Sequence, residues 1–179
     1  MAVFFKERLA FLSMLKTGTT AYQTALAPHA DLVINDPPLL KHAPVYRYNR
    51  FIRPMFHNVC DAEMELINVM RKPVSWLSSW YRYRQRPFMK DKPNNTIGIS
   101  FDEFVLAYKK GKRPGFAEVG NQLKFLEDRL EVKLRLEREN VSPTFAAVLS
   151  SDVEERFRRN FSEDFALYDS ISKTNVAGC

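Results

Sequence analysis

Short apolar runs alternate with longer segments of helical periodicity along the first part of the chain. Leu9–Leu12, Asp31–Asn35 and Met64–Met70 are short and rich in aliphatic side chains, which is the pattern of buried strands. Between the first two runs, an apolar-periodic segment over about Thr19–Ala27 predicts a helix. A strand, a helix and a strand in succession are typical of an α/β protein, so the pattern predicts a central parallel sheet flanked by helices.

The remainder of the chain is expected to be largely helical. The expected helices are Pro44–Phe56, Pro73–Tyr81, Ser100–Lys110, Phe116–Leu130 and Ser151–Ser170. The third begins with a capping box, in which Ser100 and Glu103 satisfy backbone N–H groups for each other. An edge strand is expected at Val132–Leu136, where apolar and basic residues alternate. With 179 residues, the chain is long enough for a single domain over 1–179 and too short for two comfortable ones.

The turn after the first expected strand has the chemistry of an anion-binding loop. It reads Leu15-Lys16-Thr17-Gly18-Thr19-Thr20. Gly18 has no Cβ to keep a ligand away from the backbone, and Lys16 adds a full positive charge. Thr19 and Thr20 place hydroxyl and N–H groups at a helix N-terminus, where the helix dipole favours an anion. The structural alternative is an ordinary strand-to-helix turn capped by Thr19.

The spacing within this loop differs from that of a nucleoside triphosphate P-loop. That motif is G-x-x-x-x-G-K-[ST], with its lysine directly after the second glycine. Here Lys16 stands two positions before Gly18. The loop therefore favours an anion other than the phosphates of ATP.

The balance of charge favours an acidic ligand. The chain carries 27 Lys and Arg against 21 Asp and Glu, a net charge of +6. From Pro37 to Cys60 there is no acidic residue, and the basic ones are Lys41, Arg47, Arg50 and Arg53. A second basic run comprises Arg82, Arg84, Arg86, Lys90 and Lys92. Each stretch either faces an acidic ligand or is a solvated surface, and no nucleic-acid motif accompanies them.

Cysteine usage and hydropathy bear on the compartment. Cys60 and Cys179 make neither a disulfide framework nor a metal cluster, which favours a reducing, cytoplasmic location. No run of about 18 apolar residues occurs, so no membrane span is expected. Glu7 and Arg8 interrupt the apolar start of the chain, which argues against a signal peptide.

Two motifs resemble those of one enzyme family. Lys16-Thr17-Gly18-Thr19-Thr20 resembles the 5′-phosphosulfate loop P-K-[ST]-G-T-T of sulfotransferases, with Leu15 in place of the proline. The family's second motif, R-x-P-x-x-x-x-x-S-x-Y, is matched at Arg71, Pro73, Ser79 and Tyr81. The segment Asp164–Tyr168 also resembles the family's C-terminal signature. The chain is thus similar to sulfotransferases of the bacterial and Golgi carbohydrate type, which use 3′-phosphoadenosine-5′-phosphosulfate (PAPS).

The resemblance implies a three-layer P-loop-like fold and a subsite for each end of the donor. Lys16 would contact the bridging oxygen and stabilise the leaving phosphate. The loop residues Thr17-Gly18-Thr19-Thr20 would hold the 5′-phosphate. Arg71 and Ser79 would hold the 3′-phosphate of PAPS and of the product, 3′-phosphoadenosine-5′-phosphate (PAP). The reaction needs no metal, and none is expected.

A hydroxyl acceptor also needs its proton removed. The family's base often occurs in K-x-H or K-H followed closely by proline, which makes His42 the candidate. Lys41 beside it would lower the pKa of the imidazole and keep it a base. Lys41 and Arg47 are the candidate residues for binding the acceptor, which the resemblance implies to be a carbohydrate or small molecule. The structural alternative for His42 is an exposed loop histidine.

Other functions remain open at the level of the sequence. The chain is alternatively a non-catalytic binder of PAP or of a sulfated glycan. A nucleotide kinase is disfavoured by the missing G-K-[ST] and by the lack of a Walker-B aspartate after an apolar strand. Related bacterial sequences carry a further strand near positions 128–132, which leaves the number of strands open. The oligomeric state is not indicated.

Overall fold

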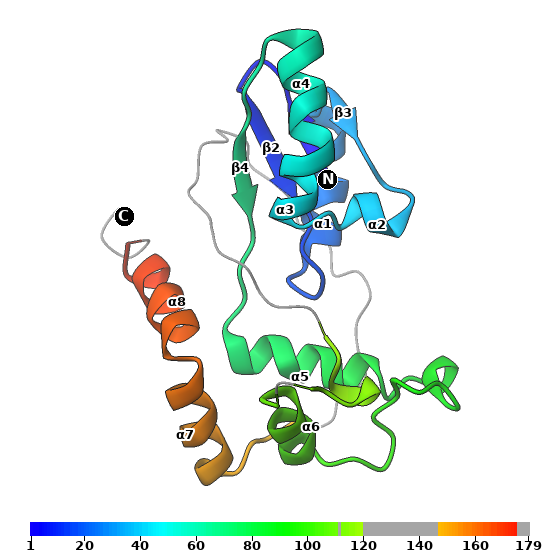
Figure 1. Cartoon of the computed structure of the whole chain (residues 1–179), viewed down its shortest axis with the longest axis vertical. Helices are drawn as coiled ribbons and strands as arrows, with labels where there is room; N and C mark the ends of the chain where they lie inside the picture. Colours follow the sequence, from blue (N-terminus) through cyan, green and yellow to red (C-terminus); the bar gives the residue numbers. More distant parts are fainter. Residues whose placement is uncertain (111, 120–146, 175–179) are drawn as a thin grey trace. The chain divides into compact units, whose positions relative to one another are not determined.

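The computed structural model describes residues 1–110, 112–119 and 147–174 (Figure 1). The described residues divide into two compact units, one made of residues 1–70 and the other of residues 71–110, 112–119 and 147–174. Each unit has its own hydrophobic core. A single domain can contain two such units, so the single-domain interpretation of 1–179 stays a prediction.

The first unit is built on a four-stranded mixed sheet. Its strands are β1 (Ala2–Phe4), β2 (Leu9–Leu12), β3 (Leu32–Val33) and β4 (Glu65–Asn68), in the order β3-β1-β2-β4. β1 is antiparallel to both of its neighbours, and β2 is parallel to β4. The three predicted strands that fall within the described residues, β2, β3 and β4, therefore run in one direction. The sheet is mixed, and not parallel throughout as expected, because β1 runs against them.

Strand β1 is missing from the sequence prediction. The charged residues that interrupt the apolar start of the chain, Glu7 and Arg8, lie in the hairpin turn that joins β1 to β2. Arg8 has a left-handed backbone, with φ of 55°, and its N–H donates to the Phe5 carbonyl at 3.2 Å. β1 therefore lies between β2 and β3, so the two strands of the expected β-α-β unit are not adjacent.

Both faces of this sheet are buried, because successive side chains alternate between two cores. One core combines Val3, Ala10 and Leu12 with Tyr48, Ile52 and Phe56. The other combines Phe4, Leu9 and Phe11 with Leu26 and Ile67. Helix α1 (Thr19–Leu26) contributes to the second core. The helical segments α3 (Val45–Arg47), η2 (Tyr48–Ile52) and α4 (Arg53–Cys60) contribute to the first (Figure 1). Helices thus lie on both faces of the sheet.

The helix expected at Pro44–Phe56 is longer in the structure. It runs from Val45 to Cys60, with a π-helical turn in η2, and ends where Asp61 adopts a left-handed backbone with φ of 46°. Two short helices were not predicted: α2 (Pro38–Lys41), and the 3-10 turn η1 (Ala27–His29) that follows α1.

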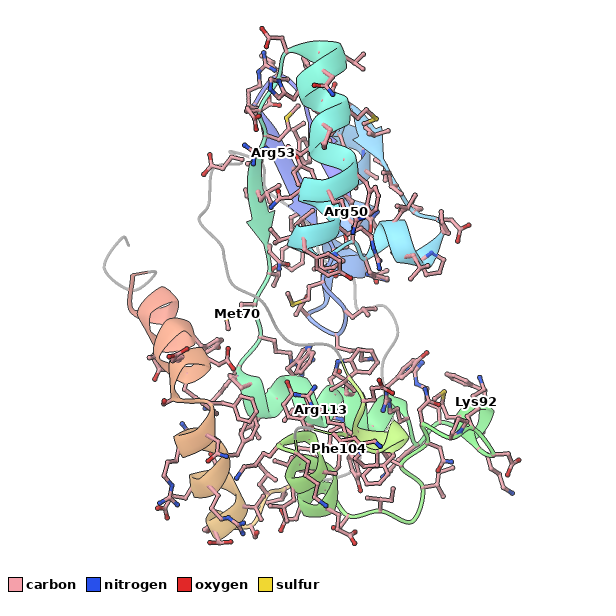
Figure 2. All side chains as sticks on the ribbon, in the orientation of Figure 1. Arg50, Arg53, Met70, Lys92, Phe104 and Arg113 are labelled. Carbon is pink, nitrogen blue, oxygen red and sulfur yellow. The ribbon has the colours of Figure 1, made fainter. Side chains whose placement is uncertain are left out.

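The second unit is helical. Its elements are α5 (Pro73–Tyr83), η3 (Pro87–Met89), α6 (Phe101–Tyr108), η4 (Gly115–Ala117), α7 (Ser151–Asn160) and α8 (Ser162–Thr174). Aromatic side chains dominate its core, where Phe104 is fully buried (Figure 2). The rings of Phe157 and Phe161 lie 4.8 Å apart, and the ring of Tyr108 lies 5.5 Å from that of Phe161. These contacts join α6 to α7.

The capping box is confirmed. The Ser100 hydroxyl accepts a hydrogen bond from the Glu103 N–H, and the Glu103 carboxylate accepts one from the Ser100 N–H. The single helix expected over Ser151–Ser170 is instead two helices separated at Phe161. Of the expected helix Phe116–Leu130, only the part up to position 119 is described, and it is a 3-10 turn followed by irregular chain. The expected strand Val132–Leu136 lies outside the described residues.

In the part of the chain that the structure describes, none of the helices is both long and apolar enough to cross a membrane.

Candidate functional site

The loop between β2 and α1 has an unusual backbone. Lys16 has φ of 66° and Gly18 has φ of 84°, so both residues are in the left-handed region. Glycine adopts this conformation without cost, whereas a residue with a side chain adopts it only rarely. An added Cβ at Gly18 would meet nothing within 4 Å. Gly18 is therefore required for its backbone angle and not to make room for a neighbouring side chain.

The threonine hydroxyls of the loop close it on itself. The hydroxyls of Thr17 and Thr19 both donate to the Met14 carbonyl, at 3.0 and 2.6 Å. This differs from the expectation that the loop hydroxyls face a ligand. The first N–H groups of α1, from Thr19 and Thr20, have no acceptor within the helix, as at every helix N-terminus. Together with the half-buried Lys16, these N–H groups are what the loop offers to an anion.

His42 lies at the same end of β2 as this loop. Its Nδ1 is 2.7 Å from the carbonyl oxygen of Ser13, which is the residue directly after β2 and three positions before Lys16. A carbonyl only accepts hydrogen bonds, so Nδ1 must carry the proton. The neutral ring therefore has its lone pair on Nε2, which leaves that atom able to accept a proton from a bound molecule.

The surroundings of His42 favour the neutral imidazole. Burial lowers the pKa of His42 below its ordinary value of 6.5, and the positive charge of Lys41 lowers it further, whereas the hydrogen bond to Ser13 opposes both. The sequence analysis predicted the direction and the part played by Lys41. Burial, which is the larger cause, could not be predicted because it depends on the packing of the sheet.

We expect the imidazole of His42 to titrate with a midpoint below 6.5, because the buried ring is harder to charge than one in water. In Lys41→Met, the midpoint should rise but stay below 6.5, since the larger cause remains. NMR titration of the ring protons measures both values. A midpoint above 6.5 in the unaltered chain would contradict the buried, neutral ring.

A buried glutamine supports the residue that His42 contacts. The Ser13 hydroxyl donates to Gln23 Oε1 at 3.0 Å, and Gln23 Nε2 donates to the Ile34 carbonyl at 3.0 Å and to Asn35 Oδ1 at 2.7 Å. Gln23 is only 3% exposed. This network was not predicted from the sequence. The available signal was the long polar side chain of a glutamine between apolar residues in the middle of the helical segment.

The basic stretch Pro37–Cys60 is partly occupied by structural contacts. Arg47 donates to the Leu39 carbonyl at 2.8 Å, which ties α3 to α2. Arg53 pairs with Glu63 at 2.8 Å, and Arg50 lies over the ring of Phe51 (Figure 2). The expectation that Arg47 binds the acceptor thus meets a guanidinium group already engaged with the protein's own backbone.

The second motif places its residues along α5. Arg71 Nε donates to the hydroxyl of Ser75 at 2.9 Å, and Ser79 lies one helical turn beyond Ser75. The structure therefore brings Arg71 onto the side of α5 that carries Ser79. The hydroxyl of Tyr81, the last motif residue, donates to the Ile99 carbonyl at 2.7 Å and is a structural contact.

One arginine of the second basic run is an internal anchor. Arg84 is 5% exposed, and its guanidinium donates to the carbonyls of Gly115 and Phe116 at 3.0 and 2.7 Å and to that of Glu118 at 2.7 Å. From the sequence, this basic run had two possible interpretations: a solvated surface, or a surface that faces a ligand. For Arg84 neither alternative holds, because the side chain points into the protein.

The predicted residues are thus gathered into two groups. Lys16, its loop and His42 belong to the first unit, and Arg71 and Ser79 belong to the second. Within the described residues, no three His, Cys, Asp or Glu side chains gather in a way that could hold a metal ion. A comparison with known proteins found no family model, no curated protein and no solved structure that matches the chain.

Proposed function

We propose that this protein is a sulfotransferase that moves a sulfuryl group from PAPS to a hydroxyl acceptor. The observation that carries the proposal is the hydrogen bond between His42 Nδ1 and the Ser13 carbonyl. It holds a neutral imidazole at the end of the strand from which the Lys16 loop begins. A base for the acceptor and a cationic loop for the donor are the two parts that the reaction needs from a protein.

The residues of the first unit suit an in-line transfer. PAPS supplies the sulfuryl group. His42 Nε2 takes the proton of the acceptor hydroxyl as the new O–S bond forms. Lys16 and the N–H groups of Thr19 and Thr20 stabilise the charge that collects on the leaving 5′-phosphate as the bridging S–O bond breaks. Such preorganised donors commonly contribute about 100-fold to 1000-fold each to the rate.

The residues of α5 suit the other end of the donor. Arg71 and Ser79 would bind the 3′-phosphate, as the resemblance to the family's second motif implies. A guanidinium is well suited to a phosphate because it offers paired N–H donors and a permanent charge. The helices on both faces of the sheet in residues 1–70 support the finer proposal that the fold is a three-layer P-loop-like one.

The proposed acceptor is a carbohydrate or another small molecule with a free hydroxyl, and the proposed location is the cytoplasm. The chemistry at His42 supports a hydroxyl acceptor, because a ring protonated on Nδ1 has on Nε2 a lone pair that can accept a proton from a neutral group. Lys41 and Arg47 are proposed to lie near the acceptor. For Arg47, this requires that the guanidinium keep its contact with Leu39 while its remaining N–H groups bind.

The direct test uses PAPS with a labelled sulfuryl group and a panel of sugars, phenols, lipids and peptides. Transfer to any hydroxyl acceptor supports the proposal. Thermal unfolding in the presence of PAP, and separately of ATP with magnesium, distinguishes the alternatives. Stabilisation by PAP without transfer to any acceptor would indicate a non-catalytic binder, and stabilisation by ATP with magnesium alone would indicate a phosphoryl transferase and overturn the proposal.

Arg71→Ala is expected to weaken PAP binding by about 10-fold to 100-fold, because a hydrogen bond to a charged group contributes about 1.5–3 kcal/mol. Isothermal titration calorimetry measures the change. The matched control is Arg158→Ala, which removes a guanidinium that pairs with Glu154 within α7 and should leave PAP affinity unchanged. Unchanged affinity in Arg71→Ala would remove this residue from the donor site.

A further inference from the structure

Helix α5 has two chemically distinct sides. Its apolar side chains, among them Trp76, Leu77 and Tyr81, belong to the core of the second unit. The positions Ser75, Ser78, Ser79 and Arg82 follow the spacing i, i+3, i+4 and i+7, which places them together on one other side of the helix. This side is called the serine face below.

Part of the serine face is withdrawn from solvent although it is polar. Ser78 and Ser79 are each only 7% exposed. A polar side of a helix is usually solvated, and a buried one has to satisfy its hydrogen-bonding groups. The serine hydroxyls can both donate and accept a hydrogen bond, so they are suitable partners for a phosphate oxygen.

Two arginines meet at the serine face. Arg71 is fixed there by the 2.9 Å bond from its Nε to the Ser75 hydroxyl. Burial lowers the pKa of Arg71, and repulsion from the positive charge of Arg82 lowers it further. An anion between like charges relieves this repulsion.

Arg82 has a donor without an acceptor. Its Nε atom is buried and has no hydrogen-bond partner among the described residues. A buried donor left unsatisfied costs about 1–3 kcal/mol, and more when it is charged. Arg84, directly after the end of α5, shows the contrast, since its guanidinium donates to three backbone carbonyls. The Nε–H group of Arg82 therefore lacks an acceptor, which a bound anion would supply.

We propose that Arg82 of α5 is an anion-binding arginine, and that with Arg71, which lies just before the helix, and the serine face it binds a phosphate group carrying two negative charges. The inference rests on the proposed function, which it makes more specific. Two arginines for one phosphate would select a nucleotide with a 3′-phosphate over one that has only a 5′-phosphate. The sequence motif contains Arg71 and Ser79 but no arginine at the position of Arg82.

The test compares two ligands in three forms of the full chain. Affinities for PAP and for adenosine 5′-monophosphate are measured in the unaltered chain, in Arg82→Ala and in Arg82→Lys. Both tryptophans of the chain, Trp76 and Trp80, lie in α5, so their fluorescence is a local signal for binding. Arg82→Ala should bind PAP about 10-fold to 100-fold more weakly while its affinity for the monophosphate is unchanged. Arg82→Lys keeps the charge but loses the Nε–H, and its loss should be smaller.

The controls separate this inference from the proposed function. Circular dichroism establishes whether the variants fold. If Arg82→Ala does not fold, the comparison of the two ligands is made with Arg82→Lys. Equal weakening for both ligands, or none in either variant, overturns the role of Arg82 and leaves the proposed function standing. If the unaltered chain fails to bind PAP, the proposed function fails. In that case, the role of Arg82 is tested with inorganic pyrophosphate as the ligand. Pyrophosphate should raise the unfolding temperature of the unaltered chain and not that of Arg82→Ala, and any other result overturns the role of Arg82.

Discussion

Lys16→Met is expected to lower the rate of sulfuryl transfer by about 1000-fold. The methionine side chain is nearly as long as lysine and keeps an apolar stem, but it lacks the charged amino group and its N–H donors, so the loss reports the stabilisation of the leaving phosphate. Removing one preorganised donor from a site of this kind costs about 100-fold to 1000-fold in kcat, and Lys16 is both a donor and the only full charge in the run from Lys16 to Thr20. Single-turnover transfer from labelled PAPS measures the effect on the chemical step.

The matched control for this prediction is Lys6→Met. Lys6 is an exposed lysine in the hairpin between β1 and β2, so its loss makes the same change in net charge outside the loop. Thermal unfolding of both variants establishes that each is folded. The change from lysine to methionine at position 16 adds no backbone strain, because both residues carry a Cβ and are equally disfavoured at a φ of 66°. If Lys16→Met retained more than a tenth of the unaltered rate, Lys16 would not stabilise the leaving group.

Arg84→Ala is expected to lower the free energy of unfolding by about 3–5 kcal/mol, because each buried acceptor that loses its donor costs about 1–3 kcal/mol. The change removes bonds to three backbone carbonyls and leaves these acceptors without their donor. It also removes the hydrogen bonds by which Arg84 joins the end of α5 to the segment around η4. Urea unfolding followed by circular dichroism measures the loss as a lower midpoint.

Lys90→Ala is the control for the anchor. Lys90 belongs to the same basic run and is exposed after η3, so its removal should change stability by no more than about 0.5 kcal/mol. A loss below about 1 kcal/mol in Arg84→Ala would show that the three carbonyls find other donors. Arg84 would then have to be considered again as a residue that can bind a ligand.

The loop and the helix motif could be predicted because each is a local signal. A glycine and a lysine at fixed spacing between an apolar run and a helical pattern are visible in a few consecutive residues. The same is true of the capping box at Ser100 and Glu103. Strand β1 was missed because its apolar residues run directly into charged ones, and only pairing with β2 shows that those charges form a turn.

The environment of the candidate base could not be predicted in full. His42 and Ser13 are 29 positions apart, and nothing in either residue's neighbourhood indicates that they meet. The same applies to Gln23, whose partners come from the ends of β1 and β3. The unpaired donor of Arg82 is likewise a property of burial, which the sequence spacing does not reveal.

By itself, the sequence determined which residues have the chemistry for an anion and in which order they follow the strands, because these depend on side-chain type and short spacing. Tertiary structure alone decided which of the basic residues are available. It assigned Arg84 to the interior and Arg47 to a backbone contact, and it gave His42 a fixed proton on Nδ1. The physical reason is that the state of a charged or titratable group depends on burial and on hydrogen-bond partners, and folding brings those partners from distant parts of the chain.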